Sequence, residues 1–199
     1  MTLFYHPLIF KFPYFIPFWV IYFWAMLPEM KIMRTALEEA KKAGSKDAGS
    51  VNVIFIVGQV GLFMSFFLAF VRFGMMRPPV PLFWAGVVFV LLGGLLRRHC
   101  WRVLGEFFTG DVKARAGQPV INRGAYRFVR HPSYTAGMML FGGVALAFGN
   151  WIGGAILMIA VVAGYVYRVR VEEKALCDTI GQPYVDFMRT RRRFIPYVV

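Results

Sequence analysis

The chain has few charged residues for its length. Only 17% of its 199 residues are Asp, Glu, Lys or Arg, whereas soluble domains have about a quarter. Hydrophobic residues make up 58% of the sequence and occur in blocks. This composition disfavours a soluble globular domain, and the apolar blocks indicate an all-α integral membrane protein.

Metal-ligating and disulfide-forming residues are also scarce. There are two cysteines, which form no CxxC pair, and three histidines, which lie far apart. They are Cys100, Cys177, His6, His99 and His131. This pattern offers no metal-ligand cluster, so we expect no metal site. Both cysteines also lie in stretches that the topology below places on the cytoplasmic side, which is reducing, so we expect no structural disulfide.

Acidic residues are outnumbered, with 10 Asp and Glu against 23 Lys and Arg and a net charge of +13. Such an excess can indicate nucleic-acid binding. Here, however, the basic residues flank the apolar blocks, so anionic lipids and membrane topology explain them better. We therefore expect membrane lipids, and no nucleic acid, as partners.

Five apolar segments approach the ~20 residues that a spanning helix needs. They run over about 10–27, 51–71, 82–96, 133–148 and 152–167. No basic leader precedes the first, which predicts a membrane helix rather than a cleaved signal peptide. The polar stretch 28–50 predicts a short surface helix ending near Gly44, and the basic aromatic run from Arg97 predicts an interfacial segment. The tail beyond Tyr167 predicts a helix leaving the membrane, a turn at GQP and another short helix.

Five spans would place Lys and Arg very unequally on the two sides. Twenty of the 23 fall within 28–50, 97–130 and the tail after Tyr167, together with all ten acidic residues. The positive-inside rule predicts that this side is cytoplasmic and that the N-terminus lies opposite. We expect residues 1–100 to hold helices one to three with a cytosolic loop at 28–50. Residues 101–199 then hold the interfacial segment, a hairpin of helices four and five, and the C-terminal helices.

The GNW sequence leaves so few residues between segments four and five that they must form an antiparallel hairpin. Two polar sequences, RHPSY and YRVRVEE, then face each other across a cytosolic cavity. Pro132 suits the first turn of a helix, and that N-terminus, beside Arg130 and His131, favours an anion. An ordinary juxtamembrane anchor with a proline start is the alternative interpretation.

Arg168 and Glu172 are four residues apart and share one helix face, whereas Glu173 points about 100° away. An ionisable residue at the edge of a membrane bundle usually faces the protein interior or a water-filled cavity. This position makes the pair a candidate site. A solvated surface pair is the alternative.

Four tyrosines lie near both polar sequences. Their ring faces could hold a cation, although an aromatic belt at the membrane interface is the simpler interpretation of each one alone. They are Tyr126, Tyr134, Tyr165 and Tyr167.

Longer motifs resemble a known family. VINRGAYRFVRHPSYTAG and YRVRVEEKALCDTIGQPYVDFMRTRRRFIP contain GxYxxxRHPxY, RxxxEE, GxxYxxF and a terminal arginine shortly before a proline. Over about 101–196 the chain resembles the isoprenylcysteine carboxyl methyltransferase family, whose wider group includes membrane phospholipid methyltransferases.

The resemblance implies an S-adenosylmethionine-dependent enzyme with a cytosolic cofactor pocket, and makes 101–199 the methyltransferase core. It implies that Arg168 and Glu172 are catalytic. It also implies that an apolar pair, Val120 and Ile121, lies beside the adenine of the cofactor. The residues implied to hold the cofactor are Val120, Ile121, Gly124, Tyr126, His131, Pro132, Tyr134 and Glu173.

The expected reaction is methylation of the carboxylate of an isoprenylcysteine-like or other lipophilic acid. Such an acid is already ionised at neutral pH and needs a cationic clamp, which Arg168 offers while Glu172 orients it. N-methylation of an aminophospholipid is the main alternative. In that reaction a glutamate would act as the base, and Arg168 would bind the phosphate of the lipid. A non-enzymatic membrane scaffold or channel, and a nicotinamide-dependent membrane reductase, are further alternatives.

Overall fold

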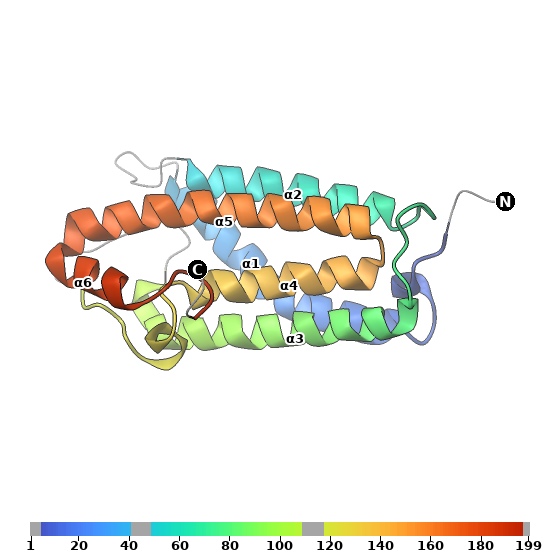
Figure 1. The fold of residues 1–199 in the computed structure, drawn as a ribbon, viewed down its shortest axis with the longest axis horizontal. Coiled ribbons are helices and arrows are strands. Elements are labelled where there is room, and N and C mark those ends of the chain that lie inside the picture. Colours follow the sequence, from blue (N-terminus) through green and yellow to red (C-terminus); the bar gives the residue numbers. More distant parts are fainter. Residues whose placement is uncertain (1–4, 41–48, 109–117, 197–199) are drawn as a thin grey trace.

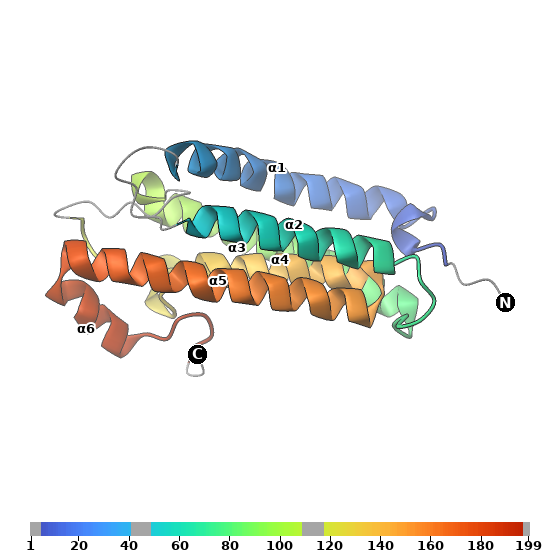
Figure 2. The ribbon, with the colours of Figure 1, turned by 90° about the horizontal axis from the view of Figure 1, so that it is seen from above.

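The apolar segments form helices in the computed structural model, which describes residues 5–40, 49–108 and 118–196. Within these residues the fold is all-helical, as predicted, with two isolated β-bridges and no sheet. The α-helices are α1 (Phe15–Ala40), α2 (Ser50–Leu68), α3 (Pro79–Leu104), α4 (Pro132–Phe148), α5 (Trp151–Ile180) and α6 (Gln182–Thr190). Three short 3-10 helices are η1 (Leu8–Phe10), η2 (Gly105–Phe107) and η3 (Gly124–Arg127). Helices α1 to α5 lie side by side as a long bundle, with α6 at one end (Figures 1 and 2).

Three of the described helices, α2, α3 and α5, are long and apolar enough to cross a membrane. Shorter apolar helical stretches are Phe15–Leu27, within α1, and the whole of α4. Large hydrophobic side chains such as Phe63, Val88 and Ile159 remain exposed on the bundle, as lipid contact requires. The chain has the character of an integral membrane protein.

The first helix differs from the prediction. The sequence predicts a break after Leu27 and a separate surface helix, but α1 runs unbroken from Phe15 to Ala40. Residues 29–40 are rich in Met, Lys, Leu, Ala and Glu, which favour helices strongly enough to continue α1 past Pro28. The predicted helix end near Gly44 lies outside the described residues.

The third helix also extends beyond its apolar segment. The predicted interfacial run from Arg97 forms the last two or so turns of α3, which ends at Leu104. The protein itself accommodates these arginines. Arg97 pairs with Glu29 of α1, and the guanidinium of Arg98 lies 4.1 Å from the ring centroid of Trp24. The predicted division between residues 100 and 101 lies within α3.

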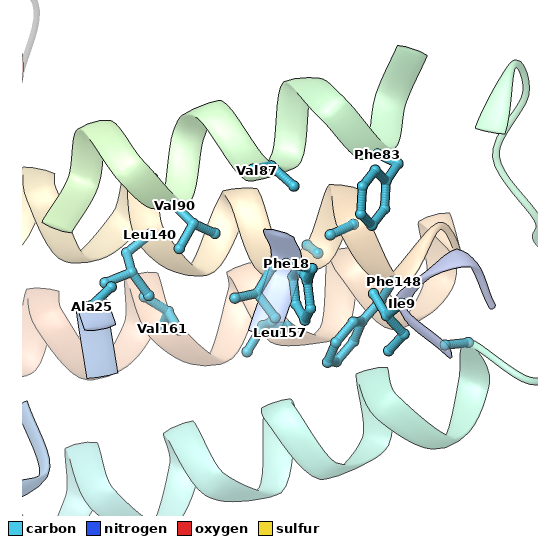
Figure 3. Close-up of a cluster of buried hydrophobic side chains, with 14 of the residues drawn as sticks. Ile9, Phe18, Ala25, Phe83, Val87, Val90, Leu140, Phe148, Leu157 and Val161 are labelled. Atoms are coloured by element: carbon cyan, nitrogen blue, oxygen red, sulfur yellow. The ribbon is translucent and has the colours of Figure 1, made fainter. Parts of the chain in front are cut away.

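Glycines allow the helices to approach closely. A Cβ on Gly86 of α3 would lie 2.6 Å from the carbonyl oxygen of Gly143 of α4, and one on Gly61 of α2 would lie 2.8 Å from the Cβ of Ala160 of α5. Small residues at helix crossings give membrane helices dense packing without a hydrophobic driving force. α3 therefore pairs with α4, and α2 with α5. Between them lie Phe18, Phe83, Phe148 and Leu157, which are almost fully buried (Figure 3).

The predicted hairpin of α4 and α5 is confirmed. Gly149 has a φ of 74°, and the side-chain oxygen of Asn150 caps α5 by accepting hydrogen bonds from the N–H groups of Ile152 and Gly153, at 3.0 and 3.1 Å. The start of α4 and the polar end of α5 therefore lie at the same end of the bundle, beside α6 (Figure 1). The predicted GQP turn and short final helix are also present, because α5 ends at Ile180 and α6 follows.

Candidate active site

A cavity of about 670 Å³ lies at the end of the bundle where α4 begins. Its polar end is lined by residues 118–121, Tyr126, 130–131, 133–134, Arg168 and Glu172. An apolar arm continues between the helices and is lined by side chains that include Tyr22, Met26, Met30, Ile54, Phe55, Leu140 and Val161. The cavity thus joins a polar chamber to an apolar space inside the bundle.

Arg168 is held rigidly at the polar end, with 4% of its surface exposed. Its Nη1 donates to the hydroxyl of Ser50 at 2.6 Å, and its Nε donates to the hydroxyl of Tyr134 at 3.3 Å. The Tyr134 hydroxyl in turn donates to the Glu172 carboxylate at 2.7 Å. The structure therefore brings both predicted catalytic residues together, with Tyr134 linking them.

A second, partly buried arginine lines the same cavity. Arg97 makes a two-pronged pair with Glu29, with N–O distances of 2.6 and 2.9 Å. Its Nη1 donates to the carbonyl oxygen of Ser133 at 2.9 Å and to the hydroxyl of the same residue. These contacts hold α1, α3 and the first turn of α4 together along one wall.

A carboxylate of the chain itself lies beside the start of α4 and contacts side chains there. The Glu173 carboxylate lies 3.1 Å from Arg130, 3.2 Å from His131 and 2.8 Å from Arg193. Burial raises the pKa of Glu173, but hydrogen bonds from His131 and Arg193, with the nearby charges, outweigh it and lower that pKa to about 2. α5 is long enough to carry Glu173 beyond its apolar part, which ends at Tyr167.

Backbone hydrogen bonds fasten the C-terminal segment over the same place. The N–H groups of Arg130 and His131 donate to the carbonyls of Arg192 and Arg193, at 2.8 and 2.9 Å. The Thr135 hydroxyl donates to the carbonyl of Phe194 at 2.8 Å. The RHP sequence is therefore held from both sides, by α5 and by the C-terminal segment.

The other predicted cofactor residues divide into two groups. Val120, Ile121, Tyr126, His131 and Tyr134 line the cavity. Burial raises the pKa of the Tyr126 hydroxyl, which keeps it protonated as a donor.

The remaining three, Gly124, Pro132 and Glu173, are not among the residues that line the cavity in the described part of the chain. Gly124 has a φ of 58°, and a Cβ there would lie 2.6 Å from Nε2 of His99, so its backbone packs against α3. Pro132 begins α4, and Glu173 anchors the C-terminal segment.

Three residues of the site were not predicted from the sequence. Ser50, Glu29 and Arg97 come from the first half of the chain, where no motif marks them. Arg193 had a signal, since arginines before Pro196 belong to the motif that carries the family resemblance.

Comparisons with known proteins agree with this resemblance. The profile of the phospholipid methyltransferase family matches residues 81–182. Protein-S-isoprenylcysteine O-methyltransferase B of Arabidopsis thaliana is 26% identical over 115 residues, which are 57% of this chain and 58% of the plant protein. Protein-S-isoprenylcysteine O-methyltransferase of Rattus norvegicus is 25% identical over 116 residues, 57% of this chain and 41% of the rat protein.

A bacterial relative extends further along the chain. YpbQ, an uncharacterised protein of Bacillus subtilis strain 168, is 23% identical over 150 residues, which are 74% of this chain and 88% of that protein. The chain spans roughly half the length of the isoprenylcysteine O-methyltransferases it matches. Because the family profile covers just over half of the 199 residues, including the start of α4 and the polar end of α5, this chain belongs to the phospholipid methyltransferase family.

Proposed function

We propose that the chain is an S-adenosylmethionine-dependent membrane methyltransferase that methylates the carboxylate of a lipophilic acid, of which an isoprenylcysteine-like acid is one example. The observation that carries this proposal is the continuity of the cavity. A polar chamber containing Arg168 joins an apolar arm between α1, α2, α4 and α5. A molecule with a charged head and a long apolar chain matches both parts at once.

The polar chamber has the chemistry that the methyl donor needs. This donor has an amino-acid end that is zwitterionic, a positively charged sulfonium and a flat base. The chamber offers a carboxylate at Glu172, ring faces at Tyr126 and Tyr134, and an apolar pair at Val120 and Ile121. These residues, with His131, would hold the donor, while Gly124, Pro132 and Glu173 would shape the pocket from behind. Bound there, S-adenosylmethionine would supply an electrophilic methyl group.

Arg168 and Glu172 are assigned complementary roles. Arg168 binds one or both oxygens of the substrate carboxylate, because a planar guanidinium presents several donors in a fixed geometry. Glu172 acts on Arg168 through the Tyr134 hydroxyl, which accepts from the arginine and donates to the glutamate. Ser50 fixes the other side of the guanidinium. Methyl transfer requires alignment of the reacting atoms and exclusion of water. A network in which Arg168 and Ser50 are buried is suited to both.

A second candidate function is N-methylation of an aminophospholipid, which the match to the phospholipid methyltransferase family favours. There the roles would reverse. Glu172 would remove a proton from the amine, and Arg168 would bind the lipid phosphate.

Incubation of membranes with methyl-tritiated S-adenosylmethionine, followed by lipid extraction, separates these functions. Carboxyl transfer gives label that alkaline hydrolysis releases as methanol, whereas N-methylation gives base-stable label in the headgroup. Wild-type protein and an Arg168→Ala variant are compared in the same membranes. The proposal predicts base-labile label in the wild-type sample alone, and absence of any labelled lipid from wild-type membranes would contradict both functions.

His131→Ala is expected to weaken the binding of S-adenosylhomocysteine, the demethylated donor, by about tenfold. His131 lines the cavity and fixes Glu173, so its removal loses a contact surface and one hydrogen bond. Calorimetry on purified protein measures this affinity. His6→Ala, an exposed histidine near η1, is the matched control. Unchanged affinity in a folded His131→Ala protein would assign RHP to the juxtamembrane anchor role.

The proposal includes five membrane spans with the cavity on the cytoplasmic side. The charge asymmetry and the arrangement of α1 to α5 support it, since α6 and the α4–α5 turn lie at opposite ends of the bundle (Figure 1). In a variant without native cysteines, Trp151→Cys is expected to react with an impermeant maleimide applied to intact cells. Asp186→Cys of α6 should react only after the membrane is opened. The reverse pattern would contradict this topology.

A further inference from the structure

Tyr165 of α5 carries a buried hydroxyl with no role in the network described above. The residue is 7% exposed and lines the cavity. Among the described residues no hydrogen-bond partner faces this hydroxyl, although the neighbouring Tyr134 hydroxyl makes two bonds. Five unpaired side-chain atoms are sealed from solvent in the described residues, on Ser65, Arg98, Trp101, Arg130 and Arg191. The Tyr165 hydroxyl is not one of them, so it reaches the open space of the cavity.

A hydroxyl at the edge of an apolar space is unfavourable unless a partner in the cavity satisfies it. Phenylalanine would fill the same volume and keep the ring contact with Tyr134, whose centroid is 5.0 Å away. A tyrosine at this position therefore has no advantage in the free protein. The hydroxyl is suited to a ligand that enters the cavity.

The lining of the cavity changes character at the height of this hydroxyl. Along α5 the cavity residues pass from Arg168 through Tyr165 to Val161. Along α4 they pass from Tyr134 through Gly137 to Leu140. Tyr165 and Gly137 are thus the last positions before the apolar arm. A Cβ on Gly137 would overlap the Tyr165 hydroxyl, so the absence of a side chain there leaves room for it.

We infer that Tyr165 is a specificity-determining residue whose hydroxyl donates a hydrogen bond to an acceptor oxygen of the substrate, where its polar head joins its apolar chain. The inference rests on the proposed function, because the head is then a carboxylate bound by Arg168. Tyr165 lies three residues before Arg168 on the same face of α5, and both side chains line the cavity. Substrates without an oxygen acceptor at this point leave the hydroxyl unpaired and are disfavoured.

Tyr165→Phe tests this role with N-acetyl-S-farnesylcysteine as the acid and tritiated methyl donor. The expected loss in kcat/KM is about ten- to a hundredfold, which is the effect of one hydrogen bond to a charged group. The affinity for S-adenosylhomocysteine and the thermal unfolding midpoint are expected to remain unchanged or rise, because no bond within the protein is lost. Tyr167→Phe, on an exposed tyrosine of α5, is the matched control.

Gly137→Ala provides an independent test, because its new methyl group would overlap the hydroxyl and the outer ring carbons of Tyr165 and must displace that side chain. Its loss in kcat/KM should be at least as large as that of Tyr165→Phe, and the two losses should not multiply in the double variant, because both changes act on the same side chain. A Tyr165→Phe protein within about twofold of an active wild type, or one that loses stability or donor affinity, would overturn the inference alone. A wild-type protein that does not methylate this acid or any other lipophilic acid would overturn the proposed function, and the inference with it.

Discussion

Replacing Arg168 by lysine is expected to lower kcat/KM for a lipophilic acid by about 100-fold or more, the effect of losing a preorganised donor in a buried site. The guanidinium of Arg168 bonds to Ser50 and to Tyr134 from different nitrogens while it faces the cavity. A lysine ammonium keeps the charge but cannot hold both partners and bind a carboxylate with two parallel bonds. The affinity for S-adenosylhomocysteine should change little, so turnover and donor binding are measured on the same preparation.

Arg170→Lys is the matched control, because Arg170 is exposed on the same helix. The single Ala variants of Arg168 and Glu172 and their double variant complete the test. If the two residues act as one unit through Tyr134, the double variant should be about as impaired as the worse single variant. Near-wild-type turnover for Arg168→Lys, or a double loss equal to the product of the single losses, would contradict the proposed clamp and its coupling to Glu172.

Glu173→Gln is expected to lower the free energy of unfolding by about 3 kcal/mol at neutral pH, because it leaves the partly buried Arg130 and Arg193 without their shared anion. The estimate is at the lower end of the range for broken buried pairs, since the Arg193 side chain is 39% exposed. The pKa of Glu173 is lowered from 4.5 to about 2. Its stabilising effect is therefore complete above pH 4.5 and disappears as the pH falls toward 2.

Thermal unfolding of both proteins in one detergent across this pH range measures the effect. The difference between wild type and Glu173→Gln should be constant at high pH and close as the pH falls below 4.5. Asp186→Asn, on an exposed carboxylate of α6, is the matched control and should differ little from wild type. A difference that persists unchanged at low pH would contradict the role of the Glu173 charge.

Local patterns predicted the second half of the chain well. Pro132 begins α4, the GNW turn closes the hairpin, and Arg168 meets the RHPSY sequence, because short turns and helical spacing determine these positions. The outcome for His131 and Glu173 was harder to predict. They bind each other, since the length of α5 returns a carboxylate to the start of α4. The distance between His131 and Glu173 can be known only from the folded hairpin.

The first half of the chain was predicted less completely. The sequence predicts a separate surface helix after Leu27, but α1 continues unbroken and places Glu29 against Arg97. Ser50 reaches Arg168 although 118 positions separate them. Such contacts depend on which helices pack together, and single-residue patterns do not encode that choice. The contribution of the first half of the chain to the cavity could therefore be recognised only from the structure.

Photo-crosslinking tests the central claim, that one cavity holds the acid at Arg168 and its chain in the apolar arm. The probe is a lipophilic acid with a diazirine near the far end of its chain, irradiated with purified protein and S-adenosylhomocysteine and mapped by mass spectrometry. We predict crosslinks to Met26, Ile54 or Leu140, which line the cavity and are not exposed on the outside of the bundle. Excess unmodified acid should suppress these crosslinks, and Arg168→Ala should weaken them. Competable crosslinks confined to the exposed outer residues, such as Val88 and Ile159, would contradict the claim.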